Sequence, residues 1–144
     1  MDLNRSLTGA GYFWVMTENT RILLADDEPD ILEVLEYNLR KEGYEVKTVS
    51  NGVDAVDMAF KFRPHLIVLD VMMPEMDGIE TCQQIRQIEE CKDILIIFLS
   101  AQGEDYSQLA GFDAGSDDYV VKPFSVKVLV RRIRALLSRA SQLH

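Results

Sequence analysis

The feature that most constrains the fold is a fivefold alternation between short apolar runs and longer amphipathic segments. The apolar runs lie at residues 22–25, 44–49, 66–69, 94–99 and 119–121. Three of them are almost wholly apolar, which is typical of strands that helices cover on both faces. The run 44–49 instead alternates between apolar and polar residues, so we expect it at the edge of the sheet. Strands that alternate with helices in this way predict a parallel sheet with helices on both faces.

The segments between the apolar runs carry apolar residues at helical spacing. In the first segment, Ile31, Leu35 and Leu39 recur every four residues, and Val34 widens this stripe. Gly43 follows the stripe, and we expect it to end the helix in a left-handed conformation.

Four further helices are predicted after the second apolar run. Asn51 is expected to cap the first of these, with Val53, Val56 and Phe60 on its inner side. The other three are predicted over a segment opened by Asp77–Gly78, over roughly residues 104–113, and from Ser125 onward.

Charged and polar residues lie where the predicted strands end. They are Asp26, Asp27 and Glu28 after the first strand, Asp70 after the third, Ser100 after the fourth and Lys122 after the fifth. Because parallel sheets bind ligands at the carboxyl ends of their strands, these side chains are expected to converge on one rim. A single Asp at a strand end is more often a helix cap than a catalytic group. Complementary groups at four strand ends favour a functional site.

The chemistry of this set suits phosphoryl transfer. Crowded carboxylates repel one another, and a hard divalent cation relieves the repulsion, so Mg²⁺ is the expected occupant. Phosphoryl transfer requires mainly positioning and charge neutralisation. Lys122 can pair with Asp70 at rest and with a phosphoryl oxygen afterwards, while Ser100 can donate a hydrogen bond to another oxygen of that group.

Five separated segments resemble the signature of response-regulator receiver domains, and in particular the OmpR/PhoB type, whose output is a winged-helix DNA-binding domain. They lie at residues 24–28, 69–74, 77–78, 99–101 and 122–124. The resemblance implies an α/β flavodoxin-like (βα)5 fold, doubly wound, with a five-stranded parallel sheet in the order 2-1-3-4-5.

The same resemblance sets the expected domain organisation. It covers residues 21–139, which would form the receiver domain. Residues 1–20 are expected to be a poorly ordered amino-terminal extension, and residues 140–144 to begin a linker or tail.

The resemblance also implies roles for the residues of the acidic rim. Asp70 would accept a phosphoryl group from a sensor histidine kinase, and the chain would be a signalling receiver rather than an enzyme. The cofactor would be Mg²⁺, bound by Asp26, Asp27, Asp70 and the backbone carbonyl of Met72.

A second set of residues is implied to transmit and time the signal. Lys122, Ser100 and Tyr119 resemble the switch residues of the family, in which the hydroxyl moves toward the phosphoryl group and the aromatic ring fills the vacated space. Met72 and Gln102 flank the position from which water would attack, so they are expected to tune the phosphoryl lifetime.

The output is the part of the switch that the sequence predicts least completely. Asp117, Asp118, Lys127 and Arg132 fit the charged face through which the subfamily forms homodimers, using the fourth helix, fifth strand and fifth helix. Ala110 stands where that subfamily commonly has an Arg, so the chain departs from the pattern. The expected output is a DNA-binding transcription regulator outside this chain.

Two alternatives to that output remain open. One is a stand-alone receiver that signals by protein contact. The other, weaker one is a Mg²⁺-dependent aspartyl-phosphate phosphatase, a class that normally has a second Asp where this chain has Met72.

Charge and composition exclude some kinds of binding partner for this chain. The formal net charge of -9 argues against direct binding of DNA or of anionic membranes by this chain. No apolar run approaches the ~20 residues that cross a bilayer. Cys82 and Cys91 form no metal-type motif, and free thiols are expected. These features predict a cytoplasmic protein.

Overall fold

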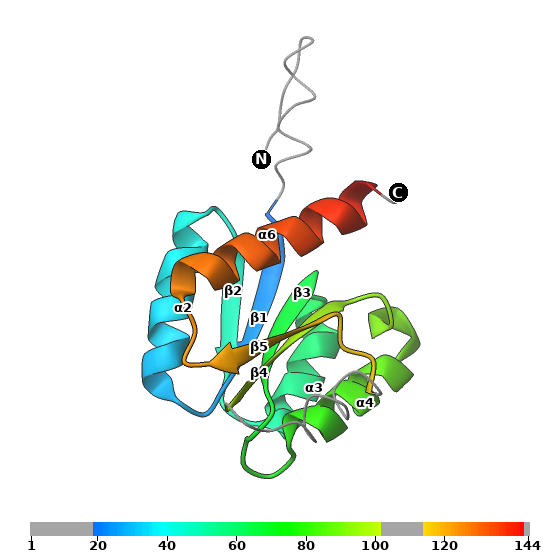
Figure 1. Cartoon of the computed structure of the whole chain (residues 1–144). Coiled ribbons are helices and arrows are strands. Elements are labelled where there is room, and N and C mark those ends of the chain that lie inside the picture. Colours follow the sequence, from blue (N-terminus) through cyan, green and yellow to red (C-terminus); the bar gives the residue numbers. More distant parts are fainter. Residues whose placement is uncertain (1–18, 102–113, 143–144) are drawn as a thin grey trace.

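The structure is a computed structural model, and the description below concerns residues 19–101 and 114–142 (Figure 1). Its elements are β1 (Arg21–Ala25), α2 (Pro29–Lys41), β2 (Glu45–Val49), α3 (Gly52–Phe62), β3 (Leu66–Asp70), α4 (Gly78–Gln87), the short 3-10 helix η2 (Glu89–Cys91), β4 (Leu95–Ala101), β5 (Asp118–Lys122) and α6 (Val126–Gln142). The five predicted strands are all present. The helix predicted over residues 104–113, together with Gln102 and Ala110, lies outside the described residues.

The five strands form one parallel sheet in the order β2-β1-β3-β4-β5. This order confirms the predicted flavodoxin-like fold, and β2 lies at an edge as its alternating sequence predicted. The register places Asp70 of β3 beside Leu99 of β4, and Ala101 of β4 beside Lys122 of β5. The carboxyl ends of the central strands therefore meet at one rim of the sheet (Figure 1).

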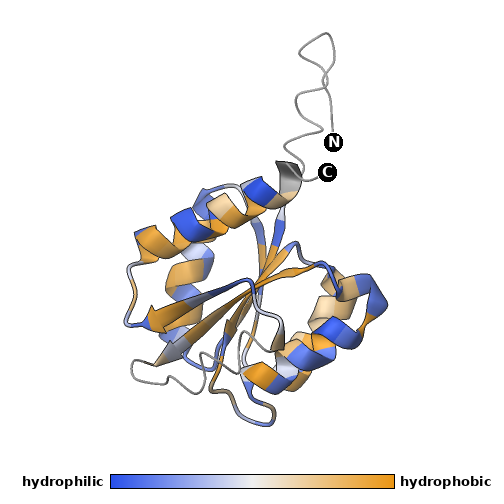
Figure 2. Cartoon of the chain, turned by 45° about the vertical axis from the view of Figure 1, so that its right-hand side comes forward, coloured by the Kyte–Doolittle hydropathy of each residue, from blue (hydrophilic) through white to orange (hydrophobic). Residues whose placement is uncertain are grey.

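Helices cover both faces of the sheet, which explains why its central strands are apolar at nearly every position. On one face, Leu23, Ile67 and Phe98 pack in a buried cluster with side chains of α3 and α4. On the other face, residues such as Ile22 and Val68 pack with α2 and α6. Figure 2 shows the hydrophobic strands enclosed between the two helical layers.

The predicted helix boundaries follow from local hydrogen bonds. Gly43 has φ +97° after α2, and its N–H donates to the carbonyl of Arg40 while that of Tyr44 donates to Leu39. This pair of bonds is the Schellman arrangement that a left-handed glycine permits. At the starts of α3 and α4, the side chains of Asn51 and Asp77 accept hydrogen bonds from backbone N–H groups three residues later.

The predicted inner face of α3 is wrong for Val53 and Phe60 and right for Val56. Val53 and Phe60 are each 47% exposed, whereas Val56 is partly buried against the core. Ala55 and Ala59 are completely buried. The helix packs closely against α4, because a Cβ atom on Gly52 would overlap the Thr81 side chain.

The predicted apolar stripe of α2 also needs one correction. Leu35 and Leu39 are buried as predicted, but Val34 is 40% exposed. Ile31 and Leu32 pack partly against the same core and widen the stripe on its other side. The apolar stripe of α2 that packs on the core therefore includes Leu32 rather than Val34.

The last helix, α6, is 17 residues long and amphipathic. Leu129, Ile133 and Leu136 are buried against the sheet. At its start, the Oγ of Ser125 accepts a hydrogen bond from the N–H of Val128. Across residues 19–101 and 114–142, neither α6 nor any other helix combines the length and apolar character that a membrane span requires.

Gly78 lies so close to the backbone of Asp70 that a larger residue there should lower the free energy of unfolding. A Cβ atom there would overlap the backbone carbonyl of Asp70, so Gly78→Ala should lower the free energy of unfolding by roughly 2–4 kcal/mol. Gly43→Ala is the comparison, since its φ is positive but no atom lies within 4 Å of the added carbon. It should lose only about 1 kcal/mol. Urea unfolding of both variants measures the difference, and equal losses would contradict the packing explanation.

Candidate functional site

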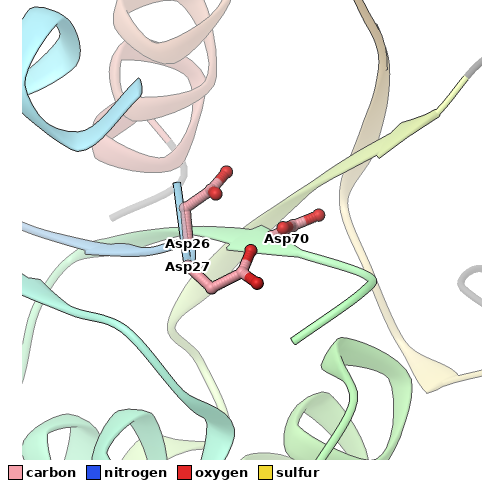
Figure 3. Close-up of side chains that lie close together, drawn as sticks. All are labelled: Asp26, Asp27 and Asp70. Carbon is pink, nitrogen blue, oxygen red and sulfur yellow. The ribbon is translucent and has the colours of Figure 1, made fainter. Parts of the chain in front are cut away.

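Three carboxylates from two strand ends meet at the rim of the sheet. Asp26 and Asp27 follow β1, Asp70 ends β3, and one oxygen of each lies within 4.8 Å of the others (Figure 3). Asp26 is 2% exposed and Asp70 is 4% exposed, while Asp27 is open to solvent. Two members of the cluster are thus buried and Asp27 is exposed, so a ligand can reach the cluster from the side of Asp27.

Lys122 supplies the positive charge of the site from the end of β5. Its Nζ lies 2.6 Å from Glu28 Oε1, 3.1 Å from Asp26 Oδ2 and 3.4 Å from Asp70 Oδ2. The structure places Lys122 beside Asp70, as expected from the sequence. Its shortest ion pair, however, is with Glu28, for which the sequence predicted no role.

Backbone groups hold the acidic side chains in place. Asp26 Oδ1 accepts a hydrogen bond from the N–H of Glu28 at 2.8 Å. Asp70 Oδ1 accepts one from the N–H of Met72 at 3.3 Å. The N–H of Val71 donates to the carbonyl of Leu99, so the loop after β3 continues the sheet pairing by one residue. These bonds fix the carboxylates relative to the strand ends.

Burial and mutual repulsion make Asp70 a weak acid for its type. Burial, followed by the negative charge of Asp26, raises the pKa of Asp70 from 3.8 to about 7. Lys122 and the N–H of Met72 act in the opposite direction without cancelling this effect. For Lys122, burial works to lower the pKa, but Glu28, Asp70 and Asp26 together raise it above the ordinary value.

The cluster has the properties of a site for a hard divalent cation. Its ligand atoms are carboxylate oxygens, which Mg²⁺ prefers. The Oδ2 atom of Asp26 is buried and accepts no hydrogen bond from the described residues, although Lys122 lies 3.1 Å away. A buried oxygen that is only partly compensated fits a metal ligand. The pKa of Asp70, raised first by burial and then by the charge of Asp26, is in line with a cation at this site.

The other predicted switch residues lie on β4 and β5 and in the loop after β3. Ser100 is completely buried at the end of β4, and Tyr119 is partly buried on β5 beside Phe98. Met72 is 63% exposed at the mouth of the site, directly after Asp70 and Val71. Position 102 lies outside the described residues.

Most of the predicted dimer residues make pairs within the chain. Asp117 Oδ2 accepts hydrogen bonds from the N–H of Ile96 at 2.8 Å and from Arg86 at 3.1 Å. Asp118 pairs with Arg132 at 3.0 Å. The structure therefore brings Asp118 and Arg132 together, whereas Asp117 is held against β4 and α4. Lys127 lines a groove between α2 and α6.

Two long-range polar pairs were not predicted, although Glu28 itself was expected at the rim. Glu28 meets Lys122 across 94 positions of sequence, and Arg86 meets Asp117 across 31. No periodicity or motif links residues so far apart. The position of Glu28 directly after Asp26 and Asp27 was the only signal that it could approach the site.

The sequence comparisons agree with this geometry. Residues 22–134 match the family described as the response regulator receiver domain. The transcriptional regulatory protein ResD of Bacillus subtilis is 47% identical over 126 residues, which are 88% of this chain and 51% of ResD. The chain thus spans about half the length of this curated relative.

Solved structures are similar over the whole described fold. A response regulator from Chloroflexus aurantiacus is 36% identical, with a TM-score of 0.79 over 84% of this chain and 99% of that one. The receiver domain of the sensor histidine kinase PA1611 from Pseudomonas aeruginosa is 33% identical, with a TM-score of 0.75 over 81% of this chain and 96% of that one. That structure is described as having a magnesium ion coordinated in its active-site cleft.

The raised pKa of Asp70 predicts a pH-dependent loss of stability in Mg²⁺-free buffer. A carboxyl whose pKa rises on folding binds more protons when folded, so its contribution to stability falls as the pH rises from about 4 to about 7. Asp70→Asn removes this loss and should be more stable than wild type by roughly 1–3 kcal/mol at pH 8, and by much less at pH 4.5.

Urea unfolding with a chelator present, at several pH values, measures this difference. Asp57→Asn is the matched control, because Asp57 is an exposed residue of α3 whose partner is Lys61. It should change stability little at either pH. An Asp70→Asn variant no more stable than wild type at pH 8 would contradict the proposed repulsion.

Proposed function

The chain belongs to the family of response-regulator receiver domains, and from that premise we propose that Asp70 accepts a phosphoryl group from a sensor histidine kinase in the cytoplasm. The observation that carries the proposal is the convergence of Asp26, Asp27, Asp70 and Lys122 on one rim. A receiver domain is part of a signalling protein and not a conventional enzyme.

In the proposed step, one oxygen of ionised Asp70 forms a bond to the phosphorus of a phosphohistidine. The bond from phosphorus to the histidine nitrogen breaks, and its electron pair returns to the imidazole, which takes up a proton. The N–H of Met72 orients Asp70, and Lys122 lies close enough to neutralise part of the incoming charge.

Mg²⁺ is the proposed cofactor. Asp26, Asp27, Asp70 and the backbone carbonyl of Met72 would hold it, and the ion would supply positive charge for the phosphoryl oxygens and for ionised Asp70. The buried Oδ2 of Asp26, which accepts no hydrogen bond from the described residues, supports this assignment.

The proposed response to phosphorylation uses Ser100 and Tyr119. The hydroxyl of Ser100 would donate to a phosphoryl oxygen, and the ring of Tyr119 would move toward the space that the hydroxyl leaves. Both residues lie on neighbouring strands, with Ser100 beside Val121 and Tyr119 beside Phe98. Met72 and Gln102 are proposed to tune the lifetime of the phosphoryl group.

We further propose that the response controls transcription through a DNA-binding output domain. Support comes from the ResD match, because this chain covers about half of a protein described as a transcriptional regulator. A stand-alone receiver that signals by protein contact is the second candidate. The observation in its favour is that Asp117 and Asp118 already pair within the chain, which leaves fewer charges for a dimer.

Phosphoryl transfer can be tested with a small-molecule donor. Acetyl phosphate and Mg²⁺ should add one phosphoryl group to the wild type, and Asp70→Asn should remain unlabelled because it lacks the nucleophilic carboxylate. Intact-mass spectrometry measures the product. Asp57→Asn, which has the same charge change on the surface of α3, should be labelled like the wild type. Labelling that persists in Asp70→Asn would place the acceptor elsewhere.

Self-association separates the two output classes. Sedimentation velocity with beryllofluoride and Mg²⁺ should show a shift from monomer to dimer if β5 and α6 form a dimer face. Asp70→Asn should show no such shift, because it cannot form the phosphoryl mimic. A wild type that stays monomeric at high concentration while binding beryllofluoride would favour signalling by protein contact.

A further inference from the structure

We infer that Glu28 is a positioning residue that holds Lys122 at rest and competes with the phosphoryl group for it. The inference rests on the proposed function, because it concerns the lysine assigned to the phosphoryl group. It adds a residue that the acidic rim does not need for metal binding but that would set how readily the switch responds.

The contact between Glu28 and Lys122 is the shortest ion pair in the site, at 2.6 Å. The backbone of Glu28 is itself fixed, because its N–H donates to Asp26 Oδ1 and its carbonyl accepts hydrogen bonds from Ile31 and Leu32 in the first turn of α2. The carboxylate of Glu28 therefore extends from a rigid position toward the end of β5.

The ammonium group of Lys122 already has carboxylate partners before any phosphoryl group arrives. It donates a hydrogen bond to Glu28 Oε1 at 2.6 Å and lies within ion-pair distance of Asp26 and Asp70. A phosphoryl oxygen that binds Lys122 therefore competes with these carboxylates.

Burial decides which partner is released. The Asp26 side chain is 3% exposed, so little water can take the place of Lys122 beside it. Asp70 carries the phosphoryl group, so Lys122 remains beside it. The Glu28 side chain is 58% exposed, and water can solvate its charge after release. Glu28 is therefore the partner that exchanges with the phosphoryl oxygen.

The expected consequence is a modest weakening of phosphoryl binding in the wild type. Exposed ion pairs contribute little, so the competition should reduce affinity for a phosphoryl mimic by about twofold to fivefold. Removal of the Glu28 charge should restore that affinity, because Lys122 no longer has to leave Glu28 to bind the phosphoryl mimic.

The test measures the dissociation constant of beryllofluoride at saturating Mg²⁺ by fluorine NMR, with wild type and Glu28→Gln compared. Glu28→Gln should bind about twofold to fivefold more tightly. Asp30→Asn is the matched control, because it removes one charge from the same turn of α2 and Asp30 has no ion pair with any described residue. It should bind like the wild type. Equal affinity of Glu28→Gln and wild type, or equal tightening by Asp30→Asn, would overturn the inference.

A double-mutant cycle tests whether the effect passes through Lys122. In a Lys122→Ala background, Glu28→Gln should no longer tighten binding, because the released ammonium is absent. The same tightening in that background would show a general charge effect and overturn the positioning role. Rates of labelling by acetyl phosphate repeat the cycle, since covalent product accumulates even where beryllofluoride binds weakly.

The wild type separates failure of the inference from failure of the proposed function. If it neither binds beryllofluoride nor becomes labelled at Asp70, the proposed function fails and the inference with it. If it does both and the cycle shows no coupling between Glu28 and Lys122, the inference alone is overturned.

Discussion

The burial of two like charges side by side is the constraint on which this site depends. Asp26 and Asp70 are almost completely buried at the end of the sheet, and Lys122 compensates them only in part, since the pKa of Asp70 remains near 7. Such an arrangement is unfavourable by itself. It persists because the apolar strands β1 and β3, packed on both faces, bring their carboxyl ends together whichever residues stand at those ends. The stability of the core thus offsets the unfavourable burial of a rim whose negative charges are not fully compensated.

The unfavourable charge balance gives the site its chemistry. A cluster that lacks positive charge favours a cation, and a buried carboxylate, here the proposed nucleophile, requires less desolvation when a donor approaches. The loop after β3 completes this arrangement, because the N–H groups of Val71 and Gly78 donate to the carbonyls of Leu99 and Val71. These bonds, with the N–H of Met72 on Asp70, hold the backbone around Asp70.

The sequence predicted what local patterns determine and missed what long-range packing determines. The apolar runs predicted all five strands and the rim where their ends meet. The inward side of α3 was predicted only in part, because Ala55 and Ala59 are buried by a close contact between helices that hydrophobicity alone does not reveal. Polar pairs were missed for a similar reason. Asp117 fitted the charge pattern of a dimer face, yet its carboxylate binds the N–H of Ile96 and the guanidinium of Arg86, and a charge pattern does not state which partner each residue finds.

The two ends of β5 are held in different ways, by neighbouring elements at its start and by the charges of the site at its end. At its start, Arg86 donates to the carbonyl of Gly115 and pairs with Asp117, and Asp117 in turn accepts the N–H of Ile96, so α4, β4 and β5 are tied together. At its end, the side chain of Lys122 is held by the charges of the site. In the proposed switch, a change in those charges would act on the carboxyl end of β5 and the start of α6, whereas the contacts of Arg86 and Asp117 would hold the amino end. The proposed signal would therefore pass through β5 because its two ends are held differently.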